Sequence, residues 1–143
     1  MKINKFEDIQ AWKEARELTK EIYALTKKPT FSRDYGLVDQ IRRAAISIMA
    51  NIAEGFDSNS DAQFISFLSY SQRSASELQS HLYVALDQSY ILENKFNELY
   101  NRIEKIKRLI GGFIKYLKTK KDQAPSTMDQ APSTMDQAPN TMD

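Results

Sequence analysis

The strongest chemical signal in the sequence is a concentration of cationic side chains over residues 102–121. This stretch contains eight lysines and arginines against one acid, Glu104, and therefore has a net charge of +7. A helix with such a charge attracts the phosphates of nucleic acids in a salt-dependent way. The basic stretch therefore indicates a surface that binds phosphate.

Helical spacing separates the cations that point outward from those that lie near the apolar stripe. The residues predicted to contact nucleic acid are Arg102, Lys105, Arg108, Lys115, Lys120 and Lys121. Lys107 and Lys118 lie closer to the apolar stripe, where long basic side chains reach outward past the core. A solvated helix face is the plainer explanation of all these cations. The helix dipole also favours cations in the last turn, although only there.

The remaining polar residues do not combine into a catalytic constellation. His81 is the only histidine, and the chain has no cysteine and no glycine-rich phosphate loop. Glu54 and Glu77 resemble a carboxylate pair, but Arg42 and Arg43 offer them ion-pair partners. We therefore predict that at least one arginine–glutamate pair joins helices or subunits. We also expect no enzymatic activity, cofactor or metal.

The composition indicates one globular domain followed by a repetitive tail. Of the 143 residues, 41% are hydrophobic and 27% are charged, which is ordinary for a soluble domain. Residues 122–142 consist of two DQAPSTM units and one DQAPNTM unit, and Asp143 follows. A proline in every unit prevents a continuous helix, and the apolar residues are too few for a core. We predict a domain over residues 1–121 and a disordered tail over residues 122–143.

Targeting and membrane signals are lacking. The first twelve residues, MKINKFEDIQAW, do not contain the apolar run of a signal peptide. No segment approaches the roughly 18 apolar residues of a membrane span. Because cysteine is also missing, we expect a cytoplasmic protein that does not engage a membrane.

Four segments carry apolar residues at the three- and four-residue steps of an amphipathic helix. They cover about residues 6–26, 37–54, 61–89 and 95–120. Their predicted caps are Asn4 with Glu7, Ser60 with Gln63, Asn94, and a left-handed Gly55. Because no segment alternates like a strand and most connections are short, we predict an all-α fold, an antiparallel up-and-down four-helix bundle.

The helix over residues 37–54 has apolar side chains on two faces. A bundle can bury only one of them. We predict that the second face forms an oligomer interface, which consists of Ile46, Met49, Ala50 and Ala53. The alternatives are a helix at the centre of a lopsided bundle, or a few tolerated exposed apolar residues.

The outward arc of the helix over residues 61–89 is small and largely uncharged. It consists of Ser66, Ser69, Gln72, Arg73, Ser76 and Ser80. Surfaces selected only for solubility usually carry more lysine and glutamate. Close packing against another helix is one explanation for these small side chains. The other is that they have no role and arose by ordinary sequence drift.

Four sequence blocks resemble a known family of helical proteins. The longest is YGLxxQIRRAAxSIxxNIAEG at residues 35–55, and the others are FxDIxxWxxA at 6–15, FxxFL at 64–68 and SxxEL at 74–78. They resemble the four-helix-bundle proteins first noticed as open reading frames within 23S rRNA intervening sequences. The resemblance covers about residues 5–118. It implies an up-and-down bundle, assembly into a homopentamer and no established catalytic chemistry.

A related branch of this family is the accessory variability determinant of diversity-generating retroelements, which binds a reverse transcriptase and RNA. The resemblance therefore implies RNA or a reverse transcriptase as partner. Two positions depart from the family pattern, since Ser71 and Arg73 replace a small apolar residue and a glycine. We expect the fold to tolerate both residues, and Arg73 to affect the packing between subunits.

These observations combine into one interpretation and one alternative. The interpretation is a non-catalytic homo-oligomeric bundle that binds RNA or a nucleic-acid-processing protein through its basic surface. The alternative is a purely structural or protein–protein interaction scaffold, whose cations serve solubility. Salt-sensitive RNA binding distinguishes the two.

Overall fold

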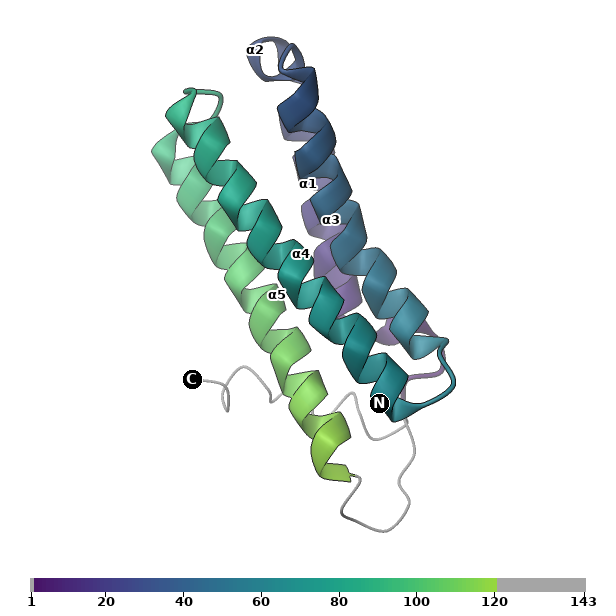
Figure 1. Ribbon diagram of the computed structural model, residues 1–143. Helices are drawn as coiled ribbons and strands as arrows, with labels where there is room; N and C mark the ends of the chain where they lie inside the picture. Colours follow the sequence, from purple (N-terminus) through teal and green to yellow (C-terminus); the bar gives the residue numbers. More distant parts are fainter. Residues whose placement is uncertain (1, 121–143) are drawn as a thin grey trace.

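The computed structural model describes residues 2–120, which form helices joined by short loops (Figure 1). The elements in chain order are the 3-10 turn η1 (Phe6–Asp8) and the helices α1 (Gln10–Thr26), α2 (Pro29–Ser32), α3 (Tyr35–Phe56), α4 (Asp61–Asp87) and α5 (Glu93–Thr119). The predicted tail and Lys121 lie outside the described residues. Along residues 2–120, no helix combines the length and the apolar character that crossing a membrane requires.

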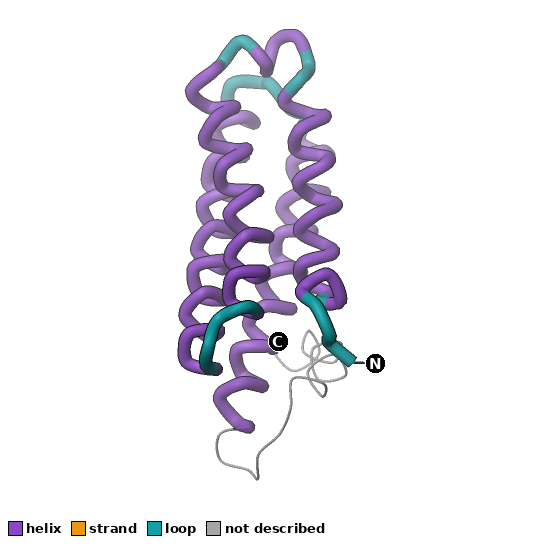
Figure 2. The backbone as a smooth tube through the Cα atoms, turned by 90° about the vertical axis from the view of Figure 1, so that its right-hand side faces the viewer, coloured by secondary structure: helices purple, strands orange, loops and turns teal. Residues whose placement is uncertain are grey.

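The four long helices pack side by side as an up-and-down bundle, with their connections at its two ends (Figures 1 and 2). α3 contacts both α1 and α4, and α5 contacts both α4 and α1. The short helix α2 lies in the connection between α1 and α3. The predicted fold class is therefore confirmed, and α2 is an addition to the predicted four helices.

The predicted apolar stripes meet in one core. Its largest fully buried side chains include Ile22, Ile48, Leu78, Leu99 and Phe113, so every long helix contributes at least one. Burying a side chain of this size contributes about 1.5–3 kcal/mol to folding. The core therefore sets the orientation of each helix, and with it the side chains that remain outside.

The first helix begins later than its sequence pattern predicts. Residues Phe6–Asp8 form a single 3-10 turn, and Ile9 is extended, with φ −76° and ψ 123°, before α1 begins. The backbone N–H of Asn4 donates to the Asp8 carboxylate at 2.9 Å. This hydrogen bond is the main reason that the pKa of Asp8 is lowered. The predicted cap of Asn4 with Glu7 is therefore wrong, because Asp8 takes the acidic role.

The predicted N-terminal cap is present in α4 and absent from α5. The Ser60 hydroxyl accepts a hydrogen bond from the Gln63 N–H at 3.2 Å, as the sequence predicts for α4. In α5, the N-cap is Leu92, and the Asn94 side chain accepts only from its neighbour Lys95, at 2.9 Å. The predicted Asn94 cap is wrong because the helix begins one residue before it.

Gly55 serves close packing and is not the left-handed cap that the sequence suggested. It is buried in the last turn of α3, and none of the glycines has a positive φ. A Cβ at this position would lie 2.7 Å from Cδ1 of Phe64 and 2.9 Å from Cβ of Phe67. Glycine therefore lets α3 and α4 approach where they meet at one end of the bundle. Gly111 and Gly112 are also buried, inside α5.

The two glycines of α3 give a matched pair of substitutions. We predict that Gly55→Ala lowers the free energy of unfolding by about 1–3 kcal/mol, because the new methyl overlaps the Phe64 ring and the Phe67 Cβ. Gly36→Ala should raise it by about 0.5–1 kcal/mol, because nothing lies within 4 Å of the added Cβ and alanine favours a helix. Urea denaturation measures both. Equal gains in the two variants would contradict close packing at Gly55.

Candidate nucleic-acid interface

Two of the predicted nucleic-acid contacts form ion pairs with acids of α1. The Arg102 guanidinium pairs with the Glu21 carboxylate, which also accepts from Lys95 Nζ at 2.6 Å. Lys105 Nζ lies 3.6 Å from Glu14 Oε2. Glu14 and Glu21 are seven residues apart, so they lie on the same face of α1, toward α5. The prediction of an outward-facing side chain is therefore wrong for Arg102, which is half-buried against α1, but it holds for Lys105, whose side chain is 50% exposed.

The cluster around Glu21 is electrostatically coupled. The hydrogen bond from Lys95 is the main reason that the pKa of Glu21 is lowered, and the charge of Arg102 adds to it. The same contact with Glu21 is the main reason that the pKa of Lys95 is raised. Each partner is about a third exposed or less, so water screens the interaction only in part. These ion pairs therefore hold α5 against α1.

The predicted contact at Lys120 is also used within the fold. Its amino group lies 3.3 Å from Oδ2 of Asp61, and its side chain is only 9% exposed. The amino group also lies 5.9 Å from the centre of the Tyr116 ring. Lys120 therefore joins the end of α5 to the start of α4. The predicted contact Lys121 lies outside the described residues.

The other two predicted contacts remain at the surface. Lys115 is exposed and Arg108 is half-buried. Within residues 2–120, neither makes an ion pair. Arg108 contributes to the low pKa of Glu104, one turn earlier on the same helix. These two cations therefore lie on the side of α5 that α1 does not neutralise.

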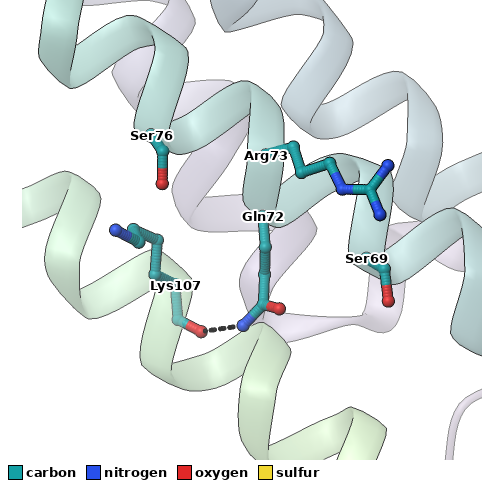
Figure 3. Close-up of a pocket in the computed structure, with 5 residues that line it drawn as sticks. All are labelled: Ser69, Gln72, Arg73, Ser76 and Lys107. Carbon is teal, nitrogen blue, oxygen red and sulfur yellow. Dashed lines mark hydrogen bonds between the residues drawn. The ribbon is translucent and has the colours of Figure 1, made fainter.

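A polar hollow lies next to these cations, between α4 and α5. Its volume is about 440 Å³, and it is lined by Ser69, Gln72, Arg73, Ser76 and Lys107 (Figure 3). The Gln72 side chain crosses to α5 and donates to the Lys107 carbonyl oxygen at 3.1 Å. In Figure 3, the head groups of Arg73 and Lys107 lie on opposite sides of Gln72. Positive charge therefore flanks the amide that bridges the two helices.

The hollow has few acids to neutralise it. α4 carries no acid between Asp61 and Glu77. Arg73 is exposed and makes no ion pair within the described chain; its guanidinium lies 5.3 Å from the centre of the Tyr70 ring. The Glu104 carboxylate lies 3.3 Å from Lys107 Nζ, and Glu77, one turn after Arg73 on α4, contacts His81 at 3.4 Å.

Glu104 is held in its charged form chiefly by an amide. The Gln79 amide donates to its carboxylate at 2.9 Å, which is the main reason that the pKa of Glu104 is lowered. Although Glu104 neutralises part of the positive charge, the hollow still brings together guanidinium, ammonium, amide and hydroxyl groups. These are the groups that proteins use to contact phosphate oxygens.

Comparison with known proteins identifies the family. A family model described as 23S rRNA-intervening sequence protein matches residues 7–112, which is 106 of the 143 residues. The chain belongs to this family. It is also similar to a crystal structure of a protein of unknown function from the S23 ribosomal protein family of Bacteroides thetaiotaomicron. That similarity has a TM-score of 0.70 at 27% identity and covers 76% of this chain and 97% of the other. None of the curated proteins matches the chain.

In this member of the 23S rRNA-intervening sequence protein family, Arg42 and Arg43 do not pair with Glu54 or Glu77 inside the described chain. Arg42 Nε donates to the Thr26 hydroxyl at 2.9 Å, and its guanidinium lies 4.4 Å from the Tyr23 ring centre. Arg43 and Glu77 each pair within their own helix. Arg43 lies 2.9 Å from Asp39, and Glu77 lies 3.4 Å from His81. An arginine–glutamate pair between subunits remains a prediction. No three His, Asp or Glu side chains among residues 2–120 are grouped to hold a metal ion.

The predicted oligomer face of α3 lies on the outside of the bundle. Ile46 is 43% exposed, Ala50 is exposed, and Met49 and Ala53 are half-buried. Met49 also borders a groove of about 510 Å³ between α1 and α3. The rest of that lining consists of Arg16, Thr19, Lys20 and Tyr23. One bundle therefore leaves this apolar face uncovered, and its use as an interface remains a prediction.

Three polar side chains are buried in the described chain, Thr26, Ser71 and Gln79, and sequence reasoning missed Thr26 and Gln79. Ser71, a departure from the family pattern, donates to the Ile48 carbonyl oxygen at 2.7 Å, so its hydroxyl is satisfied inside the core. Gln79 is buried against α5 and joins Glu104 and Lys107. The signal for Gln79 was its spacing, since it lies seven residues after Gln72 and so on the same edge of α4.

The ion pairs of Glu21 make stability depend on pH in a defined direction. We predict that Glu21→Gln lowers stability by about 1 kcal/mol at pH 7, or about 3 °C in Tm. Because folding lowers the pKa of Glu21, its contribution is present above the unfolded pKa near 4.3 and is lost as the pH falls through the folded value.

Thermal melts at pH 7 and pH 3 test this prediction. The difference between Glu21→Gln and the natural chain should be largely lost at pH 3. The control is Glu17→Gln, whose partner Lys20 lies 3.7 Å away in an exposed pair on the same helix. If Glu21→Gln melts like Glu17→Gln at pH 7, the cluster does not stabilise the bundle.

Proposed function

We propose that this protein is a non-catalytic homo-oligomer that binds nucleic acid through the groove between α4 and α5. The observation that carries the proposal is the polar hollow in that groove, with the head groups of Arg73 and Lys107 at its edges. Two further cations, Arg108 and Lys115, extend the positive surface along α5. The family is also named for intervening sequences of an RNA gene, which favours RNA as the nucleic acid.

The predicted mode of contact is to phosphate and not to base edges. Four cations, Arg73, Lys107, Arg108 and Lys115, outnumber two acids, Glu77 and Glu104, in this part of the described surface. Contacts to phosphate position a nucleic acid but carry little sequence information. Binding should therefore be weakly sequence-specific and should decrease steeply as salt increases.

Assembly supports the same proposal. A second copy of the chain would cover the exposed apolar face of α3, and the family resemblance points to a homopentamer. Each subunit would bring one cationic groove, so that several grooves contact one nucleic-acid chain. Linked sites of this kind bind more tightly than any one site alone.

A scaffold that binds a protein partner, such as a reverse transcriptase, is the second candidate function. The observation that favours it is the use of Arg102, Lys105 and Lys120 in ion pairs within the bundle. These contacts neutralise three cations of the surface that the sequence predicted, although the Lys105 side chain stays 50% exposed. The scaffold would still assemble through α3, so nucleic-acid binding separates the two functions.

For assembly, we predict that light scattering gives a mass several times the 16.5 kDa of one chain. Ile46→Glu should reduce that mass, because a carboxylate would be buried without a partner at the interface. It should leave the bundle folded, because Ile46 is 43% exposed in one subunit.

The control for assembly is Gln40→Glu, which adds the same charge at an exposed position of α3. Its mass should equal that of the natural chain. A natural chain that is monomeric at micromolar concentration would contradict assembly. An unchanged mass in Ile46→Glu would mean that the subunit interface lies on another surface.

For nucleic-acid binding, we predict that reversing three surface cations abolishes most of the affinity. The variant combines Arg73→Glu, Arg108→Glu and Lys115→Glu. Each lost phosphate contact should lower the slope of log affinity against log salt by about 0.7–0.9, so the triple variant should lose about 2–3 units of slope. Anisotropy titrations with a structured RNA at low and physiological salt measure this.

The matched control makes the same charge change elsewhere. It combines Lys27→Glu, Lys28→Glu and Arg33→Glu, three exposed cations around the short helix α2. This control should retain most of the salt slope. No binding by the natural chain at low salt would leave the scaffold function, and equal losses in both triple variants would show that the groove is not the site.

A further inference from the structure

An aromatic cluster lies along the same α4–α5 groove, beyond the hollow. Tyr83 of α4 packs against Phe96 of α5, with ring centres 4.7 Å apart, and its centre lies 6.1 Å from that of Tyr100. Phe96 and Tyr100 lie 5.7 Å apart. Tyr83 is nevertheless 50% exposed. Its ring is therefore held by α5 while much of its surface remains in solvent.

The exposed ring and the hollow belong to one edge of α4. The residues of this edge recur at steps of three and four, and they are Ser69, Gln72, Ser76, Gln79 and Tyr83. From Arg73 to Tyr83 is ten residues, which corresponds to about 15 Å along a helix. At the roughly 3.4 Å rise of a stacked strand, this distance spans about four nucleotides. The cations and the ring are thus within reach of one short strand.

An exposed aromatic ring next to phosphate-binding groups distinguishes single strands from duplexes. In a duplex, the faces of the bases are already stacked on each other, so only the backbone is available to the protein. The unpaired bases of a single strand can stack on an aromatic side chain while their phosphates contact nearby cations. Tyr83 would contribute nothing to binding a duplex.

We propose that the α4–α5 groove binds single-stranded nucleic acid, with phosphates at Arg73 and Lys107 and a base stacked on Tyr83. This inference rests on the proposed function, because it names the class of nucleic acid that the same groove takes. Lys107 keeps its contacts with Glu104 and Gln79 at one side of the hollow, so Arg73 provides the more accessible charge. Tyr83 provides the selectivity for unpaired bases.

The test compares two RNA probes of equal length on the full chain. One is an unstructured 12-nucleotide single strand, and the other is a blunt 12-base-pair duplex. We expect the single strand to bind more tightly than the duplex. Tyr83→Leu should weaken single-strand binding about 5- to 150-fold, the range for loss of one stacked base, and should leave duplex binding unchanged. Tyr83→Phe should bind the single strand as tightly as the natural chain, because it keeps the aromatic ring.

The control is Tyr35→Leu, which removes a tyrosine that is 81% exposed at the start of α3. It should not change the binding of either probe. If neither probe binds at low salt, the proposed function itself fails. If the duplex binds as tightly as the single strand, or if Tyr83→Leu leaves single-strand binding intact, nucleic-acid binding stands and the single-strand inference is overturned. A lower oligomer mass in Tyr83→Leu would also overturn it, because the ring would then be a subunit contact.

Discussion

The close packing of α3 against α4 is the constraint on which the rest of the structure depends. Gly55 leaves no room for a Cβ beside Phe64, and the Ser71 hydroxyl donates across to the Ile48 carbonyl oxygen. Small residues and satisfied hydroxyls let the two backbones approach, so α4 directs its apolar stripe toward α3 and the core. Its remaining polar edge then faces α5. The hollow and the aromatic cluster both lie along that edge, while the second apolar face of α3 is left outside the bundle.

Charge is distributed unevenly around α5 because its two neighbours differ. α1 presents Glu14 and Glu21, which pair with Lys105 and Arg102. Along its middle, α4 presents serines, glutamines and Arg73, so Glu104 is the acid that pairs with Lys107 there, and Asp61 pairs with Lys120 only at the far end of α5. The high positive charge of residues 102–121 therefore does not become a uniform basic face. One side of the helix stabilises the bundle, and the other side forms the candidate site.

Most of the fold could be predicted because helix periodicity is local information. The four long helices and their buried stripes follow from apolar spacing alone, and the residue blocks identify the family. Asn4 and Gly55 were misassigned because a capping pattern does not reveal which backbone turn or neighbouring ring is present. The site was predicted only in part. Which cations are neutralised depends on which helix lies beside α5 and in what register. The spacing of residues within one helix gives neither the neighbouring helix nor the register. The small, uncharged arc of α4 was visible in the sequence, but its position beside Lys107 was not.

The central claim is that nucleic acid contacts the α4–α5 groove. Ultraviolet crosslinking of the full chain to a single-stranded RNA, followed by mass spectrometry of the crosslinked peptides, tests it directly because it maps contact without any substitution. We expect the crosslinks to concentrate in the α4 peptide that contains Tyr83 and in the α5 peptides that flank Lys107. Crosslinks confined to α1 or to the α1–α3 connection, with none in α4, would contradict it.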